Sequence, residues 1–327
     1  MDVAFWEWMI RGDDSPPHCD AGILGKLGLI KRDGIIKSRN GPWRARDRFD
    51  APPSRVPGPV WNFDRMGQTR TELASGTLVC IAGEHEDSYD PDFHIYNDVV
   101  VLGPSDEVEI YGYPKHVFPP TDFHTATFDG DRLIIIGCVG CPEDRVEGHT
   151  PVYSLDLANY SIQRIETSGE VPGWISRHEA ELDQARQVIT VRRGRVMVRR
   201  SDNVWFRLNV EEFELSLRTR SWRRLTDRNW AQFTVRPADR KWFRLVVLPD
   251  FDQFRPTGVS IEARPSVDGT SLRLVVEGVP VRFIVGTCAV EIVIEGTLPT
   301  RVAQRVIDEA RRHVESAIRG PCVVDAL

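Results

Sequence analysis

Apolar and polar residues alternate over short runs through the first two thirds of the chain, which is the spacing of β-strands with one buried face. Three such runs are "EVEIYGY" from Glu107, "YSIQRIE" from Tyr160 and "EFELSLR" from Glu212. Continuous Val- and Ile-rich runs, such as "LIII" at 133–136, predict strands buried on both faces. We therefore expect a mainly β fold in this part of the chain.

One stretch of sequence occurs three times. "RTELASGTLVCIAG" (70–83) and "HTATFDGDRLIIIG" (124–137) share a polar start, a small turn, an apolar run and a final glycine, and a weaker copy begins at His178. The starts at positions 70, 124 and 178 are 54 residues apart in both steps. A period near 50 with several strands per repeat is typical of β-propeller blades.

A second strand keeps nearly the same period. It begins as "NDVVVLG" at Asn97, "TPVYSLDL" at Thr150 and "NVWFRLN" at Asn203, with 53 residues between successive starts. The glycines that end the first apolar runs, Gly83 and Gly137, are expected at positive φ because glycine has no Cβ. Two registers with similar periods indicate a true repeat.

These repeats resemble the kelch motif. The resemblance rests on "FHTATFDGDRLIIIG", "YNDVVVL", "VYSLDL" and "VPGWISRHEAEL", and it covers roughly residues 41–234. The second glycine of the motif is replaced by Glu84 in one copy and by Cys138 in the next. The resemblance implies a kelch-like β-propeller with three clear repeats, and it leaves open whether there are more blades or an incomplete propeller.

The pattern changes near the end of the chain. Residues 270–299 predict two or three strands, broken at 277–278 and at 285–286. "PTRVAQRVIDEARRHVESAIRG" predicts a helix with one apolar face, Pro299 in its first turn and Gly320 at its C-cap. "PCVVDAL" predicts a final edge strand. We divide the chain into an N-terminal segment (1–40) that could supply a divergent blade, a kelch-like propeller (41–236) and a small α+β domain (237–327).

Composition narrows the range of partners. The chain has 48 acidic and 42 basic residues, a formal net charge of −6, whereas a nucleic-acid-binding surface should be basic. No apolar run approaches the ~20 residues that span a bilayer, and the first residues lack the basic start of an export signal. Six irregularly spaced cysteines do not make a disulfide framework. We expect a cytoplasmic protein with no nucleic-acid or membrane partner.

Two acidic loops are the candidate binding surface. Each lies between two predicted strands of a repeat, and loops of this kind crowd one face of a propeller, where function usually resides. Together they could attract a cation or an arginine of a protein partner. The candidate residues are Glu84, His85, Glu86, Asp87, Asp90, Asp92 and His94 in the first loop, and Glu143, Asp144 and His149 in the second.

A metal site is the alternative reading of the first loop. Glu86, Asp90 and His94 are similar to the E-x-x-x-D-x-x-x-H iron-binding triad of plant nitrile-specifier proteins, which are also kelch propellers. The resemblance implies a metal at these three residues. The loop is rich in acids in any case, so we assign no metal and no cofactor.

Two further sets of residues could take part in chemistry but fit an architectural role better. His124 and His178 fall at the same phase of the repeat, so we expect each to bond a backbone group of a neighbouring unit. Cys138-x-x-Cys141 is half of a zinc site, with His149 as the nearby third candidate. The pair follows a predicted strand where the repeat calls for glycine, which favours a structural role.

We therefore expect a non-enzymatic scaffold that binds a protein partner through its propeller loops, with no catalytic residue assigned. The C-terminal domain would serve packing or assembly, and a homo-oligomer is compatible with this reading. The alternative is a metal-dependent or sugar-modifying kelch-type enzyme with its site in the 83–98 loop, because such folds do host enzymes.

Overall fold

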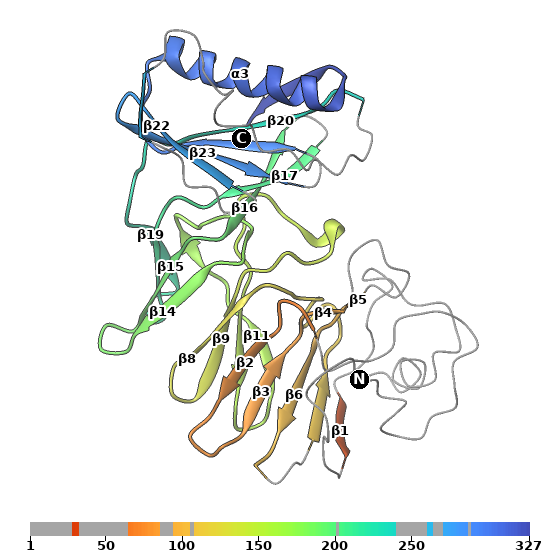
Figure 1. Cartoon of the computed structure of the whole chain (residues 1–327). Helices are drawn as coiled ribbons and strands as arrows, with labels where there is room; N and C mark the ends of the chain where they lie inside the picture. Colours follow the sequence, from red (N-terminus) through yellow and green to blue (C-terminus); the bar gives the residue numbers. More distant parts are fainter. Residues whose placement is uncertain are drawn as a thin grey trace, which may run out of the picture. The chain divides into compact units, whose positions relative to one another are not determined.

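The protein is mainly β, with several antiparallel sheets (Figure 1). This confirms the expected class. The computed structural model describes residues 28–32, 65–85, 94–104, 108–200, 203–239, 260–263, 271–286 and 289–327. Two compact units divide the fold: Met1–Met197 with Glu211–Thr226, and Val198–Val210 with Asp227–Leu327.

The first unit contains three sheets that each hold a four-stranded antiparallel meander. The innermost strands β2, β8 and β14 lie next to one another in that order. In the first sheet the strands are β2 (Thr69–Glu72), β3 (Leu78–Ile81), β6 (Asp98–Leu102) and β7 (Val108–Gly112). In the second they are β8 (Thr125–Phe128), β9 (Arg132–Ile136), β10 (Val152–Asp156) and β11 (Ile162–Arg164). In the third they are β14 (Glu179–Asp183), β15 (Val188–Arg192), β18 (Phe213–Ser216) and β19 (Ser221–Arg224).

Two short strands extend the outer edges of these sheets. β1 (Gly28–Arg32) pairs antiparallel with β7, so the 1–40 segment adds a strand to the first sheet. β12 (Ser168–Gly169) pairs in parallel with β19 of the third sheet. The rest of residues 1–64, including the start of the expected propeller, lies outside the described residues.

The second sheet packs on both of its faces. Leu133 and Ile135 join the core shared with the first sheet, and Ile134 and Ile136 join the core shared with the third. All four side chains are buried, at 1% exposure or less. The continuous apolar run at 133–136 therefore has the cause inferred from the sequence, because successive side chains of a strand point to opposite faces.

The third sheet is apolar on one face only. Ile189, Leu215 and Trp222 pack toward the second sheet, whereas the alternate positions of β18 and β19 carry polar and charged side chains. Among these, Glu214 accepts hydrogen bonds from Arg186 at 2.6 Å and from Arg223 at 3.2 Å. A polar outer face is what closes the end of a repeat array. The described array of sheets therefore ends at this sheet.

The third repeat departs from the expected register. The stretch from Asn203 was predicted to correspond to the strands from Asn97 and Thr150, which are β6 and β10, but that place in the third sheet is taken by β18, where Phe213 and Leu215 reach the core. β16 (Arg195–Arg200) and β17 (Asn203–Leu208) leave the repeat between β15 and β18, and Val198–Val210 belongs to the second unit. The 53-residue spacing to Asn203 is therefore a coincidence, because Asn203 begins a strand of the inserted hairpin and not a strand of the repeat.

The second unit is an antiparallel sheet covered by a helix, which confirms the α+β reading of this part. The strand order is β21-β22-β23-β24-β20-β25. Helix α3 (Thr300–Ile318) buries Val306, Ile307, Ala310 and Val314 in the core of the unit. The strands are β20 (Ala231–Pro237), β21 (Ile261–Ala263), β22 (Ser271–Val276), β23 (Val279–Val285), β24 (Val290–Ile294) and β25 (Cys322–Ala326).

Two boundaries differ from the sequence prediction. β20 pairs with both β24 and β25, so the second unit takes in residues that the predicted division at 236–237 assigned to the propeller. The helix ends at Arg319, which adopts the left-handed conformation at φ 54° instead of Gly320. The Gly320 N–H then bonds the Glu315 carbonyl at 3.2 Å, which satisfies a free carbonyl of the last turn. No helix in the described parts has the length and hydropathy needed to cross a bilayer.

Candidate functional site

The candidate site lies on one end of the three sheets of the first unit. In each antiparallel meander the second-to-third strand loop and the connection to the next sheet leave from the same end. The described parts of these segments are residues 82–85, 94–97, 113–124, 137–151 and 165–178, and we call their common surface the loop face. The second acidic loop predicted from the sequence and the two described ends of the first, Glu84–His85 and His94–Ile95, belong to it.

The first acidic loop is described only at its two ends. β4 (Glu84–His85) pairs with β5 (His94–Ile95), and His85 lies opposite His94 in the backbone register. Outside the described residues lie Glu86, Asp87, Asp90 and Asp92. The iron-triad reading therefore stays a prediction, and elemental analysis of the wild type against Glu86→Ala and His94→Ala tests it.

Glu84 contributes to a buried junction of three loops. Its side chain bonds that of Asp122, which is fully buried. Asp122 also accepts the Gly140 N–H at 2.6 Å through Oδ1, and its carbonyl accepts the Val139 N–H at 3.1 Å. Burial raises the pKa of Asp122, against the opposing effect of the hydrogen bonds from Gly140 and Glu84. The arrangement ties loops together and leaves Asp122 closed to a substrate.

Glu143 and Asp144 lie on a single 3₁₀ turn, Pro142–Asp144, where both already pair with Lys115. The Lys115 ammonium lies 3.3 Å from Glu143 and 3.1 Å from Asp144. Burial lowers the pKa of Lys115, but its hydrogen bonds to Asp144 and Glu143 outweigh this and raise it. The expected cation-seeking role therefore does not fit these two acids, because a lysine of the chain fills it.

A metal at this turn is disfavoured for the same reason. Ligand atoms of Cys141, Glu143 and Asp144 lie within 4.8 Å of one another, but a metal ion would have to displace the Lys115 ammonium. Cys138 is also buried, and burial raises the pKa of its thiol well above the usual value. A thiol held protonated is a poor ligand and nucleophile, which supports the structural reading of Cys138-x-x-Cys141.

His149 pairs with an arginine instead of the cysteines. The Arg164 Nη2 donates to His149 Nε2 at 3.2 Å, and the His149 ring lies 6.5 Å from the Trp174 ring. Burial, followed by the Arg164 charge, lowers the pKa of His149. A neutral imidazole can accept this hydrogen bond near pH 7, so His149 orients the guanidinium without neutralising it.

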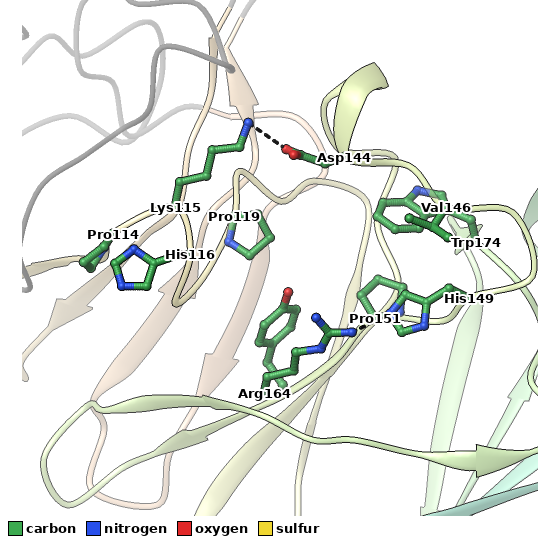
Figure 2. Close-up of a pocket in the computed structure, with 11 residues that line it drawn as sticks. Pro114, Lys115, His116, Pro119, Asp144, Val146, His149, Pro151, Arg164 and Trp174 are labelled. Carbon is green, nitrogen blue, oxygen red and sulfur yellow. Dashed lines mark hydrogen bonds and ion pairs between the residues drawn. The ribbon is translucent and has the colours of Figure 1, made fainter.

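Lys115, Asp144 and His149 are among the residues that line a cavity of about 680 Å³ on the loop face (Figure 2). That volume is in the range of ligand pockets, which are largely apolar with a few placed polar groups. Figure 2 shows the Lys115–Asp144 pair beside the 3₁₀ turn, and Arg164 beside His149. The lining residues are the prolines 114, 119 and 151, the rings of His116, His149, Tyr153 and Trp174, the charged Lys115, Asp144 and Arg164, and Val146.

The aromatic walls of the cavity are held in place by their own contacts. The Trp174 indole N–H donates to the Val139 carbonyl at 3.0 Å. The Tyr153 ring makes an edge contact with Phe118 at 5.3 Å, and its hydroxyl has no hydrogen-bond partner among the described residues. Burial raises the Tyr153 pKa, so this hydroxyl keeps its proton and can donate.

Sequence reasoning found only part of this site. Asp144 and His149 were named as candidates and do line the cavity. Lys115, Arg164 and Trp174 were missed because they come from separate segments that only the packing of two sheets brings together. The one available signal was the Pro-rich connection "YPKHVFPPTD" at 113–122, which follows a predicted strand.

The two repeat histidines serve the architecture, as expected, but with a different partner. His124 Nε2 is 2.8 Å from Thr69 Oγ1, and His178 Nε2 is 2.9 Å from Thr125 Oγ1. Each histidine thus bonds a hydroxyl on the innermost strand of the preceding sheet, and not a backbone group. Burial lowers the pKa of His124 to about 3 and that of His178 to about 4.

Neither a known family model nor a curated protein sequence matches this chain. The loop face and its cavity are therefore the features from which a function can be inferred.

Proposed function

We propose that this chain is a kelch-like repeat scaffold whose loop face binds a protein partner. The proposed architecture is an incomplete propeller of three consecutive blades. Equivalent left-handed residues, Gly67, Phe123 and Arg177, precede the innermost strands at φ 63°, 48° and 55° and support this reading. So does a repeated hydrogen bond at 2.8 Å, from Phe123 N–H to the Gly67 carbonyl and from Arg177 N–H to the Phe123 carbonyl.

The cavity on the loop face is the observation that carries the binding function. Its volume is about 680 Å³, and its walls combine proline and aromatic surface with oriented charged groups. Anchor side chains of a partner that enter such a pocket supply most of the binding energy of an interface. Because Trp174 and Arg164 are already held by hydrogen bonds, little ordering is needed on binding.

Affinity capture with two matched variants tests the proposal. Val146 lines the cavity with 55% of its surface exposed, and Phe128 at the β8–β9 turn is 44% exposed at the opposite end of the sheets. Since both side chains are exposed, an arginine at either position should leave the fold intact. We expect Val146→Arg to lose a partner that the wild type and Phe128→Arg retain from native lysate.

Equal capture by all three proteins would contradict a binding role for the loop face. So would the absence of any protein that the wild type enriches over an empty resin. Circular dichroism of each variant confirms that the comparison is made between folded proteins.

A further inference from the structure

The charges that line the cavity leave one guanidinium available. Of the three formally charged lining residues, Lys115 and Asp144 neutralise each other at 3.1 Å. Arg164 is the third, and its bond to His149 brings no negative charge. The formal charges of the lining residues therefore sum to +1, while Glu143, beside Lys115, and Glu166, beside Arg164, lie outside the lining.

The remaining partner of Arg164 is weakly held. Glu166 lies 3.0 Å from the Arg164 Nε, but its side chain is 77% exposed and that of Arg164 is 51% exposed. Ion pairs this exposed contribute little because water screens them. A ligand anion can thus replace or share Glu166 at small cost, and the guanidinium retains donors for it.

The surroundings of Arg164 favour an anion that carries an apolar flank. The Tyr153 hydroxyl supplies a second donor in the same pocket, and Trp174, Pro119 and Val146 supply apolar wall. A charged hydrogen bond is stronger where apolar groups exclude water. A carboxylate suits the planar fork of arginine, which can hold both of its oxygens.

We propose that the cavity recognises an acidic side chain in an extended segment of the protein partner, with Arg164 as the carboxylate-binding residue and the Trp174–Pro119 wall as the site for an adjoining apolar or proline residue. This inference rests on the proposed function of the loop face. It also reverses the expectation of an arginine-seeking surface, since the exposed partner-seeking charge in the described pocket is positive.

Selection of displayed random linear peptides on the full-length protein tests the inference. The enriched peptides are then synthesised with amidated C-termini, so that only side chains supply carboxylates, and their dissociation constants are measured by fluorescence anisotropy. Each peptide is compared with a version in which glutamine or asparagine replaces the acid.

Arg164→Gln and Arg192→Gln are the matched variants. Arg192 also lies on a strand, 3.0 Å through Nε from a glutamate, and its side chain is 45% exposed, but it lies on the outer side of the third sheet. We expect the enriched peptides to share an acidic residue beside an apolar one. Affinity should fall about tenfold or more in Arg164→Gln, as the loss of one charged hydrogen bond predicts, and stay unchanged in Arg192→Gln.

The amide peptide should lose the same factor on the wild type and lose nothing further on Arg164→Gln, because both changes remove one interaction. Enriched peptides without acids, or peptides bound equally by Arg164→Gln, would overturn the carboxylate inference and leave the scaffold function standing. A selection that enriches no peptide would count against the docking of protein segments in this cavity, and hence against both proposals.

Discussion

Arg65 and Asp98 form the most enclosed ion pair among the described residues of the first sheet. The guanidinium bonds both carboxylate oxygens, at 2.5 and 2.9 Å, and stacks 3.5 Å from the centre of the Tyr96 ring. Their side chains are 0% and 5% exposed. Arg65 also donates to the Ala82 carbonyl at 3.1 Å, so the pair fixes the start of the loop that carries Glu84.

Asp98→Asn should destabilise the protein strongly. The substitution leaves a buried guanidinium without its counter-charge, which typically costs about 3–5 kcal/mol. Urea unfolding monitored by tryptophan fluorescence measures the change. Glu179→Gln, at the exposed pair with Arg192, is the control and should shift the midpoint little. A similar small shift for Asp98→Asn would show that the pair is not needed for the fold.

The buried histidines predict a pH dependence of stability. His124 and His178 have pKa values of about 3 and 4 in the fold, below the ordinary value near 6.5. The unfolded chain therefore binds more protons as the pH falls below about 6.5, and each histidine removes about 2 kcal/mol of stability by pH ~5.

A glutamine at both positions should remove that part of the pH dependence. In the structure Gln68 follows the left-handed Gly67 as His124 follows Phe123, so it, and not the Arg70 of the sequence alignment, is the equivalent residue of the first sheet. Glutamine can still bond the threonine hydroxyls. The free energy of unfolding in urea, measured near pH 7.5 and near pH 5, should fall less in the double variant His124→Gln/His178→Gln. Equal losses in both proteins would mean that other groups dominate the acid response.

For single residues, the sequence predicted the role of a side chain better than its hydrogen-bond partner. The shared phase of His124 and His178 was enough to infer an architectural role, because a repeat reuses its own contacts. It could not reveal the Thr69 and Thr125 hydroxyls as partners, since these lie about one repeat away in sequence. Arg164 and Lys115 were missed for the same reason.

The turns that end the second strand of each sheet hold the elements together. Gly137 adopts φ 67°, as expected of a glycine that ends an apolar run. A Cβ built there would lie 2.2 Å from the Ile175 carbonyl oxygen and 2.9 Å from His178 Cε1. Gly148 has a similar φ of 74°, but a Cβ there would meet no atom within 4 Å.

A comparison of Gly137→Ala with Gly148→Ala therefore separates the cost of a left-handed backbone from the cost of a steric clash with neighbouring atoms. A left-handed alanine costs about 1–2 kcal/mol at either site. Gly137→Ala should cost about 1–3 kcal/mol more, because the 165–178 connection must move. Thermal unfolding by calorimetry compares the two variants. Equal melting temperatures would indicate that the 165–178 connection does not approach Gly137 this closely.

Elements with strong local patterns were predictable, and the inserted pair was not. The helix at 300–318 and the strand breaks near 277 and 285 follow from periodicity and turn residues in one short window. β17 has an ordinary strand pattern, and only pairing decides which sheet receives it. Gln232 holds that segment in the second unit by bonding both the N–H and the carbonyl of Leu208 at 3.0 Å.

At the scale of the molecule, the chain passes between the two units three times, so each unit is built from two separate segments. A fragment of residues 238–327 lacks β20, which lies between β24 and β25. We expect it to unfold without a cooperative transition, whereas residues 198–327 should melt cooperatively in circular dichroism. Cooperative unfolding of the shorter fragment would contradict the described strand order.

The polar outer face of the third sheet indicates where the described array of sheets in the proposed propeller ends. A sheet placed between two others needs two apolar faces, as the second sheet has. Composition and period alone suggested blades, but the end of the array is visible only when Glu214, Arg186 and Arg223 are seen to share one face. The sequence therefore predicted the repeating unit well and the extent of the array poorly.

Site-specific photocrosslinking tests most directly whether the cavity on the loop face binds a protein partner through Arg164. A photoreactive phenylalanine analogue is placed at position 146 beside the cavity, or at position 128 at the opposite end of the sheets. We expect a discrete adduct from position 146 that Arg164→Gln abolishes and Arg192→Gln preserves, with no such adduct from position 128. Adducts that are the same from both positions, or that survive Arg164→Gln, would contradict this expectation.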